Sequence, residues 1–262
     1  MSATASASSY YQSVAGLDQD YVYAGEASNL ELRAARLIYR DASRKTSGHA
    51  RAFQRTSSNA INDTEVEVQR RRVGGWELGL NHREFIGSAT LDANVAYRRG
   101  TGAFGSLPAP EEAFGEGTSR MRLFTADVAL NAPFQIAGQR LRYSALWRAQ
   151  WNRTPLTPQD RFAIGGRYTV RGFDGELSLM GERGWLLRND IGWALGPSGA
   201  ELYAGIDHGE VGGPSTAYQL GTRLTGGVLG LRGAWQGLAY DLFVGAPISM
   251  PEGFRTARVT AG

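Results

Sequence analysis

The sequence predicts an all-β protein, an antiparallel β-barrel whose strands cross a membrane. Three observations predict this fold class. Glycine makes up 35 of the 262 residues, a share that suits many strands joined by tight turns. Polar and apolar residues alternate over long stretches, which indicates strands with one apolar and one polar face. The polar faces carry Arg, Glu and Asp in mid-strand, which a wet barrel lumen can hold and a dry core cannot.

Composition excludes several other classes of protein. No stretch approaches the ~18 consecutive apolar residues of a transmembrane helix, and the mean hydropathy of −0.31 is compatible with alternating membrane strands. The net charge is +3 and the arginines are scattered, so nucleic-acid binding, which needs a basic face, is not expected. The first residues lack the charged and apolar regions of a signal peptide. Any export signal is therefore expected outside this sequence.

Residues 1–27 are small and polar, and they are predicted to hold a partial strand near Tyr10, Tyr11 and Val14 and then a loop over residues 16–27. The barrel portion is predicted over residues 28–262. Its first strand, residues 30–40, is rich in Leu, Ala, Arg and Glu and could form a helix on propensity alone. It is assigned to a strand because the segments that follow it alternate.

The clearest alternation lies in residues 141–152, where one face carries Leu141, Tyr143, Ala145, Trp147, Ala149 and Trp151. Segments of this length suit a tilted membrane strand of ~9–11 residues better than the ~5–6 residues usual in soluble proteins. The apolar faces would contact lipid, with interfacial aromatic girdles predicted at Trp76, Tyr97, Trp147, Trp151, Trp185 and Trp193. A soluble β core filled by these aromatic residues is the alternative. The other predicted strands, which bring the count to about twelve, are residues 65–69, 76–83, 91–98, 124–130, 184–195, 200–208, 226–235, 238–246 and 255–262.

The connections divide into short turns and long loops, as expected for the two sides of a membrane barrel. Tight turns are predicted at residues 41–45, 73–75, 86–88, 133–138, 196–199 and 236–237, and a long exposed loop at residues 100–119. Alternation does not explain a second long connection, residues 153–181. This connection is predicted to fold back into the barrel.

The tip of that connection is the candidate functional motif, made of Val170, Arg171, Gly172, Phe173, Asp174, Gly175 and Glu176. Its glycines let the backbone bend or approach another surface closely, and an aromatic residue serves as an anchor. A guanidinium binds a carboxylate through two parallel hydrogen bonds, so Arg171 is expected to pair with an acidic residue in a poorly hydrated space. The alternative is a hairpin tip with a solvated arginine, since exposed charges are common.

Several stretches resemble one known family. GRYTVRGFDGE, then GERGWLLRNDIGWAL and ELYAGIDHGEVGG, are similar to the C-terminal part of the two-partner secretion transporters, the TpsB family of haemolysin and filamentous-haemagglutinin secretion/activation proteins. RDASRKT, NDTEVEVQRRR and GWELGLNHREFIG resemble the middle strands of the same barrels. The likeness covers almost the whole chain.

The resemblance implies a sixteen-stranded outer-membrane barrel, of which this chain would hold the C-terminal twelve or thirteen strands as an incomplete portion. In the family the sixth extracellular loop folds into the lumen, and the arginine at its tip pairs with an acidic residue of the inner wall. Arg171 matches that arginine and Asp207 matches the acid. The phase agrees, because Tyr203, Gly205 and Asp207 would face inward. The family's periplasmic POTRA domains are expected upstream and are absent from this chain.

The function expected from the resemblance is a passive pore that secretes a partner exoprotein of the haemolysin or adhesin type. Its partners would be the exoprotein in transit and the outer-membrane lipid, and neither catalysis, a cofactor nor a metal is expected. Another kind of outer-membrane barrel, a porin or a phospholipase, is the alternative. The histidines that a phospholipase could use are His49, His82 and His208, and the pattern places no serine in a constrained turn beside them.

Overall fold

The computed structural model describes residues 1–15, 20–196 and 199–262, and in these ranges the protein is almost entirely β. Most of the chain lies in one 13-stranded antiparallel sheet. The strands along this sheet are β1 (Ser2–Ala15), β2 (Asp20–Arg40), β3 (Arg44–Ile61), β5 (Arg71–Ile86), β6 (Ala89–Thr101), β7 (Arg122–Ile136), β8 (Gln139–Asn152), β11 (Arg183–Ala194), β12 (Glu201–Gly212), β13 (Arg223–Trp235), β14 (Leu238–Ser249) and β15 (Thr260–Ala261). The predicted all-β antiparallel fold is confirmed.

Shorter elements fill the connections. β4 (Thr64–Glu65) pairs with β3, while β9 (Phe162–Ile164) and β10 (Leu179–Gly181) form a separate two-stranded sheet. The 3₁₀ helices are η1 (Glu67–Gln69), η2 (Ala103–Gly105), η3 (Pro110–Phe114), η4 (Pro158–Asp160) and η5 (Pro214–Tyr218). Over the described ranges, no helix has the length and apolar character to cross a membrane.

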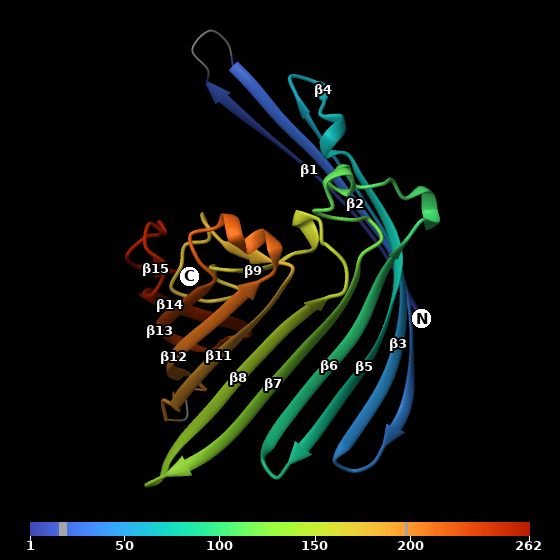
Figure 1. Ribbon diagram of the computed structural model, residues 1–262. Coiled ribbons are helices and arrows are strands. Elements are labelled where there is room, and N and C mark those ends of the chain that lie inside the picture. Colours follow the sequence, from blue (N-terminus) through green and yellow to red (C-terminus); the bar gives the residue numbers. More distant parts are fainter. Residues whose placement is uncertain (16–19, 197–198) are drawn as a thin grey trace.

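The sheet curves round on itself, so that one face is an outer surface and the other lines a lumen (Figure 1). The short turns lie at one rim, and the long connections, including the one that contains β9, lie at the other. The sheet order runs from β1 to β15, and these two end strands do not pair with each other in the part of the chain that the structure describes. The strands therefore form an open section of a barrel wall.

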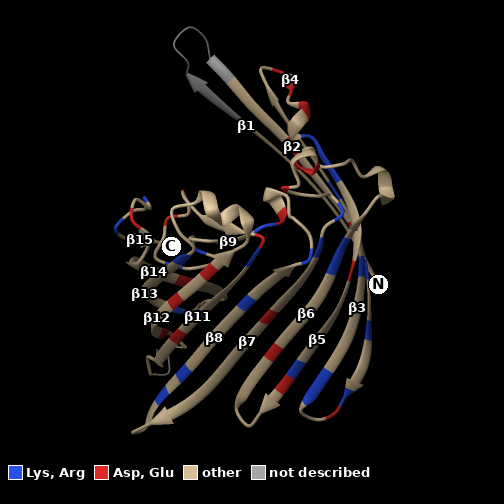
Figure 2. Ribbon diagram, viewed as in Figure 1, with Lys and Arg blue, Asp and Glu red and all other residues tan. Residues whose placement is uncertain are grey.

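Alternation along the strands separates the two faces. On β5, Leu78 and Leu80 point outward and are 53% and 49% exposed, whereas Glu77 points into the lumen and is 7% exposed. The Glu77 Oε2 accepts hydrogen bonds from Arg51 Nη2 at 2.7 Å and from Arg98 Nε at 2.8 Å. Charged residues occur along much of the length of the strands (Figure 2). An apolar exterior around a polar, ion-paired interior is the arrangement of a membrane barrel.

The loop predicted over residues 16–27 is wrong where the structure describes it, because β2 already begins at Asp20; residues 16–19 lie outside the described residues. The ends of β1, β2 and β3 near this hairpin project beyond the rim (Figure 1). Strands that project beyond a bilayer can meet water on both faces, so they can pair without an apolar face. Alternation of polar and apolar residues therefore does not reveal them.

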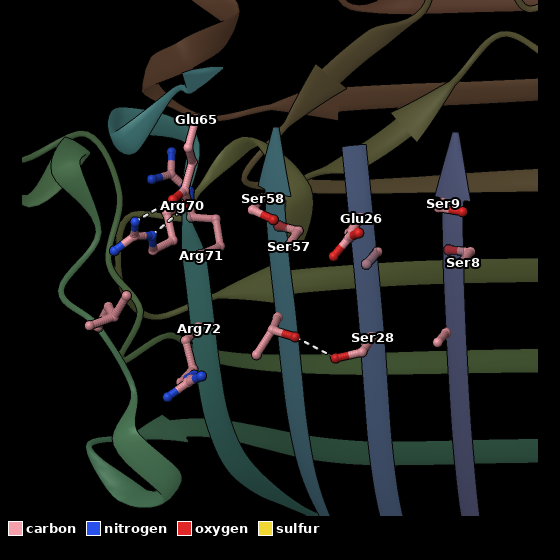
Figure 3. Close-up of a pocket in the computed structure, with 14 residues that line it drawn as sticks. Ser8, Ser9, Glu26, Ser28, Ser57, Ser58, Glu65, Arg70, Arg71 and Arg72 are labelled. Carbon is pink, nitrogen blue, oxygen red and sulfur yellow. Dashed lines mark hydrogen bonds and ion pairs between the residues drawn. The ribbon is translucent and has the colours of Figure 1, made fainter. Parts of the chain in front are cut away.

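A polar groove lies on this projection. Figure 3 shows Ser8, Ser28 and Ser57 on three adjacent strands, with Arg71 and Arg72 on the neighbouring β5. In the strand register, Ser8, Ser57 and Arg71 lie on one face of the sheet, whereas Ser28 and Arg72 lie on the other. Both faces of the projection are therefore polar.

Two predicted turns are also wrong in extent. Residues 73–75 lie within β5, where their glycines mark close packing instead of a turn. A Cβ on Gly75 would lie 2.2 Å from the carbonyl oxygen of Arg99 and 2.9 Å from the ring of Phe53. The turn predicted at residues 133–138 is shorter, because β7 continues to Ile136.

Two predicted strands are mostly irregular. Of residues 65–69, Glu65 alone belongs to a strand, and η1 follows. The chain turns just before β4 at Asn62 and Asp63, whose φ angles are 47° and 61°. Of residues 255–262, only the last three pair with β14, those of β15 and Gly262, whose backbone exchanges hydrogen bonds with Phe243. Thr256 and Ala257 instead bind Asp174 in the long connection between β8 and β11. The division into residues 1–27, 28–262 and an inward loop over 153–181 remains a prediction.

Candidate functional site

The connection between β8 and β11, called the inward loop below, packs against the luminal face of the sheet. It leaves β8 after Asn152 and rejoins the wall at Arg183. Apolar side chains of the loop, the wall and the C-terminal segment form one buried cluster, which contains Phe162, Ile164, Val170, Phe173, Leu179, Leu186, Val211, Leu224 and Phe254. Removal of this apolar surface from water holds the loop against the wall.

Arg171 lies at the tip of the inward loop and is 3% exposed. Its Nε and Nη2 donate to the two carboxylate oxygens of Asp207 at 2.6 and 2.7 Å, and its backbone N–H donates to Asp207 Oδ2 at 3.0 Å. The Nη2 also donates to Asp190 Oδ1 at 2.6 Å. A bidentate contact of this kind fixes position as well as charge. The structure thus brings together Arg171 and Asp207, the two residues that the family resemblance implies as partners.

Glycines allow the tip backbone to lie this close to the wall. Gly172 has a φ of 93°, a left-handed conformation that glycine adopts at no steric cost. A Cβ at Gly172 would lie 2.5 Å from the carbonyl oxygen of Ala246 in β14. A Cβ at Gly226 in β13 would lie 1.8 Å from the carbonyl oxygen of Arg171. The contact therefore depends on small residues on both sides.

The Arg171 contact belongs to a larger ionic network on the inner wall. Arg232 of β13 joins two acids, with Nη1 3.3 Å from Asp190 Oδ2 and Nη2 2.6 Å from Glu201 Oε1. Its guanidinium also lies over the ring of Tyr203, 4.5 Å from the centroid. The network contains the cations Arg171, Arg188 and Arg232 and the acids Asp190, Asp207 and Glu201. Alternating charges offset the desolvation that each group would suffer alone.

The environment keeps Arg171 charged. Desolvation by burial lowers the pKa of Arg171, because it disfavours the charged form. The hydrogen bonds to Asp207 and Asp190 outweigh this effect and raise the pKa above its ordinary value. The tip contact therefore does not respond to pH through loss of the arginine's proton.

The remaining motif residues divide by burial. Val170, Gly172 and Phe173 are buried, whereas Asp174, Gly175 and Glu176 are exposed. Phe173 packs edge-on against Phe254, with the ring centroids 5.9 Å apart. The Asp174 Oδ2 accepts a hydrogen bond from the backbone N–H of Ala257 at 2.6 Å. The tip is thereby joined to the C-terminal segment as well as to the barrel wall.

Asp190 is a site residue that sequence reasoning missed. It lies on β11 directly opposite Gly205 of β12, and a Cβ on Gly205 would lie 2.3 Å from Asp190 Oδ1. Alternation in β11 places Asp190 on the same face as Arg188, so the sequence pattern already indicates that Asp190 faces the lumen. The register between β11 and β12, which the sequence does not reveal, decides that Asp190 reaches the same arginine as Asp207.

A second contact that sequence reasoning missed fixes the base of the inward loop. Asp160 in η4 accepts a hydrogen bond from Arg55 Nη2 of β3 at 2.6 Å, and its side chain is 2% exposed. Thr157 Oγ1 donates to the same carboxylate at 3.2 Å. Arg55 and Asp160 are 105 positions apart, so no local pattern connects them. The loop is held at its base by β3 and at its tip by β11 and β12.

The histidines have other partners than a catalytic serine. Within the described residues, the side-chain hydrogen bonds of His49, His82 and His208 go to Asn81, Thr46 and Thr225. A search of the same ranges finds no group of three or more His, Cys, Asp or Glu residues that could hold a metal ion. The chemistry that the site displays is ion pairing that positions a loop.

Comparison with known proteins assigns the chain to a family. The family model for haemolysin secretion/activation protein ShlB/FhaC/HecB matches residues 1–233. Outer membrane transporter CdiB-2 of Burkholderia pseudomallei (strain 1026b) is 36% identical over 259 residues, which are 97% of this chain and 44% of the relative. Hemolysin transporter protein HpmB of Proteus mirabilis is 23% identical over 159 residues, which are 58% of this chain and 28% of the relative.

Solved structures agree with the sequence relatives. CdiB from Acinetobacter baumannii superposes with a TM-score of 0.88 at 32% identity, covering 99% of this chain and 46% of that one. CdiB from Escherichia coli shares the fold, with a TM-score of 0.86 at 20% identity and a coverage of 99% and 48%. The chain spans less than half the length of these relatives. The family model covers most of the sequence and a relative above 30% identity covers nearly all of it, so the chain belongs to the family of haemolysin secretion/activation proteins ShlB/FhaC/HecB.

Proposed function

We propose that the full-length protein is an outer-membrane pore that secretes a partner exoprotein of the haemolysin or adhesin type. The names of its relatives, outer membrane transporter and hemolysin transporter, support this function. The chain spans less than half of those relatives, so the step that recognises the exoprotein is part of the proposal. POTRA domains, which the family resemblance implies upstream, would perform it in the periplasm.

The ion-paired inner wall suits the passage of an unfolded chain. Luminal charges are matched by opposite charges on neighbouring strands, as at Glu77 with Arg51 and Arg98. Such a surface stays hydrated and offers a moving polypeptide no dry apolar patch on which to stick. In this proposal the exoprotein crosses as an extended chain and folds outside, and folding supplies the direction. The pore catalyses no reaction and uses no nucleotide, metal or cofactor.

The observation that carries the proposal is the buried contact of Arg171 with Asp207 and Asp190. It positions the inward loop in the lumen, where the loop's placement decides how much room a transiting chain has. Two acids bind the guanidinium of this one arginine, and its backbone N–H also donates to Asp207, while Gly172 and Gly226 leave room for the close approach of the backbone. We infer that the contact holds the loop and the barrel in the arrangement that is competent for secretion.

The Arg171→Ala variant tests this role. Breaking a buried ion pair costs about 3–5 kcal/mol, so the loop should leave the wall and secretion should fall more than about tenfold. Exoprotein in the medium is measured by immunoblotting, and heat-modifiable electrophoretic mobility reports whether the barrel is folded. Arg223→Ala is the matched control, because the Arg223 side chain is 68% exposed in its pair with Glu210. Parental secretion by a folded Arg171→Ala barrel would refute the role.

A further inference from the structure

Three arginines form a row on the outer surface of the barrel, near the rim that carries the long loops. Arg99 at the end of β6 lies directly opposite Arg122 at the start of β7. The backbone N–H of Arg153, just after β8, donates to the carbonyl oxygen of Arg122 at 2.7 Å. All three residues are exposed. The row therefore crosses three adjacent strands at one level.

Aromatic contacts show that this row faces outward. The Arg153 guanidinium lies over the ring of Phe124, 5.9 Å from its centroid. Phe124 contacts Tyr97 with ring centroids 4.8 Å apart, and Tyr97 contacts Trp76 at 5.6 Å. Trp76 lies directly opposite Arg99, so the aromatic residues and the arginines share one face. Aromatic side chains gathered near one rim mark the level of the membrane interface.

The arginines of the row lack acidic partners. Their neighbour Arg98 faces the lumen, and its Nε lies 2.8 Å from Glu77 Oε2. Within the described residues, by contrast, no acidic side chain pairs with Arg99, Arg122 or Arg153. Like charges directly opposite each other on adjacent strands are destabilising. Three adjacent cations at the interface therefore call for an anion from outside the chain.

We propose that Arg99, Arg122 and Arg153 bind the phosphate groups of a phosphorylated glycolipid in the outer leaflet of the membrane. The planar guanidinium donates two parallel hydrogen bonds to a phosphate, and basic residues at a membrane surface attract anionic lipid. The acyl chains of the same lipid would lie against Tyr97, Phe124 and the 46% exposed Trp151. The site follows from the placement of the barrel in the outer membrane and does not depend on secretion.

Lipid binding to the full-length protein in detergent tests the proposal by native mass spectrometry. The probes are lipid A with both phosphates, the same lipid A without phosphate, and inorganic phosphate. Because it removes three cations from the site, the triple variant Arg99→Gln, Arg122→Gln, Arg153→Gln should bind phosphorylated lipid A about 100-fold more weakly. The corresponding triple Lys variant should retain part of the affinity, because it keeps the charge and loses the fork geometry.

The matched control is the triple variant Arg36→Gln, Arg40→Gln, Lys45→Gln, which removes the same charge from exposed positions near the turn between β2 and β3. This control should bind lipid A as the parent does. The proposal would be overturned if the Gln triple at Arg99, Arg122 and Arg153 bound lipid A as tightly as the parent does. It would also be overturned if the control triple lost as much affinity, or if the parent bound lipid A without phosphate equally well. Full displacement of lipid A by inorganic phosphate at equal concentration would show a site for a free anion and overturn it too. If the Gln triple fails to fold, the Lys triple and the lipid comparison decide.

Discussion

At the scale of single residues, the site is defined as much by absent side chains as by present ones. The sequence identified Arg171 because a cation beside glycines and an aromatic residue is unusual for a solvent loop. Nothing in the sequence indicates that the carbonyl oxygen of Arg171 packs closely against Gly226, which is far along the chain. A glycine in a strand reads only as a weak point or a close approach, and the approaching partner becomes visible only in three dimensions.

Gly226→Ala should therefore displace the loop tip although it removes no charge. The new Cβ would lie 1.8 Å from the Arg171 carbonyl oxygen, and relief of such a clash costs about 1–3 kcal/mol. We expect faster trypsin cleavage within residues 161–171 and reduced secretion. Gly102→Ala is the control, because the nearest atom to its Cβ would be the Arg120 guanidinium end at 3.6 Å. Parental protease resistance in Gly226→Ala would contradict this account.

At the scale of elements, alternation predicted the long strands from β5 to β14 but missed β3, and it predicted the short segments poorly. Residues 141–152 alternate through their whole length and lie in β8. Residues 65–69 alternate over too few positions, and pairing with β3 stops after Glu65, shortly before η1 begins. The inward loop was predicted because its pattern fails. Its attachment to β3 was not, since no strand was predicted over residues 44–61, which contain Arg55.

The attachment of the loop base predicts energetic coupling between Arg55 and Asp160. Each of Arg55→Gln and Asp160→Asn should loosen the loop, and the double variant should be hardly looser than either, with a coupling of about 0.5–3 kcal/mol. The frequency of open events in planar-bilayer conductance recordings measures the effect. Arg44→Gln should change nothing, because the Arg44 side chain is 53% exposed in its pair with Glu84. Additive effects of the two substitutions would show that the contact does not restrain the loop.

At the scale of the whole molecule, the fold followed from period-two patterning, whereas the site required the closing of distant segments onto one another. The inward phase of Asp207 was readable in its own strand. The joint use of Asp190 and Asp207 depends on register, and the contact of Asp174 with Ala257 joins residues 83 positions apart. Contacts of this range leave no periodic trace in a sequence, so they are found only once the sheet is assembled.

The contact between the loop tip and the C-terminal segment should depend on pH. The hydrogen bond from the Ala257 N–H lowers the pKa of Asp174, so its contribution is present above the ordinary value of about 3.9 and is lost as pH falls through the lowered pKa. At neutral pH, Asp174→Asn should speed hydrogen exchange in residues 254–258. As the pH falls, the variant and the parent should converge. Glu176→Gln, a change at an exposed neighbour, is the control, and a difference that persists in acid would contradict the assignment.

The inward loop connects distant parts of the barrel wall, because its base binds β3 and its tip binds β11 and β12. Any widening between β3 and β12 must release either Asp160 from Arg55 or Arg171 from its acids. In the first contact the Arg55 side chain is 36% exposed, whereas in the second the side chains of Arg171 and Asp207 are almost fully buried. Water can compete for the Arg55–Asp160 contact more easily than for the contact of Arg171 with its acids. A barrel under strain would therefore lose the contact at the base of the loop first and keep the one at its tip.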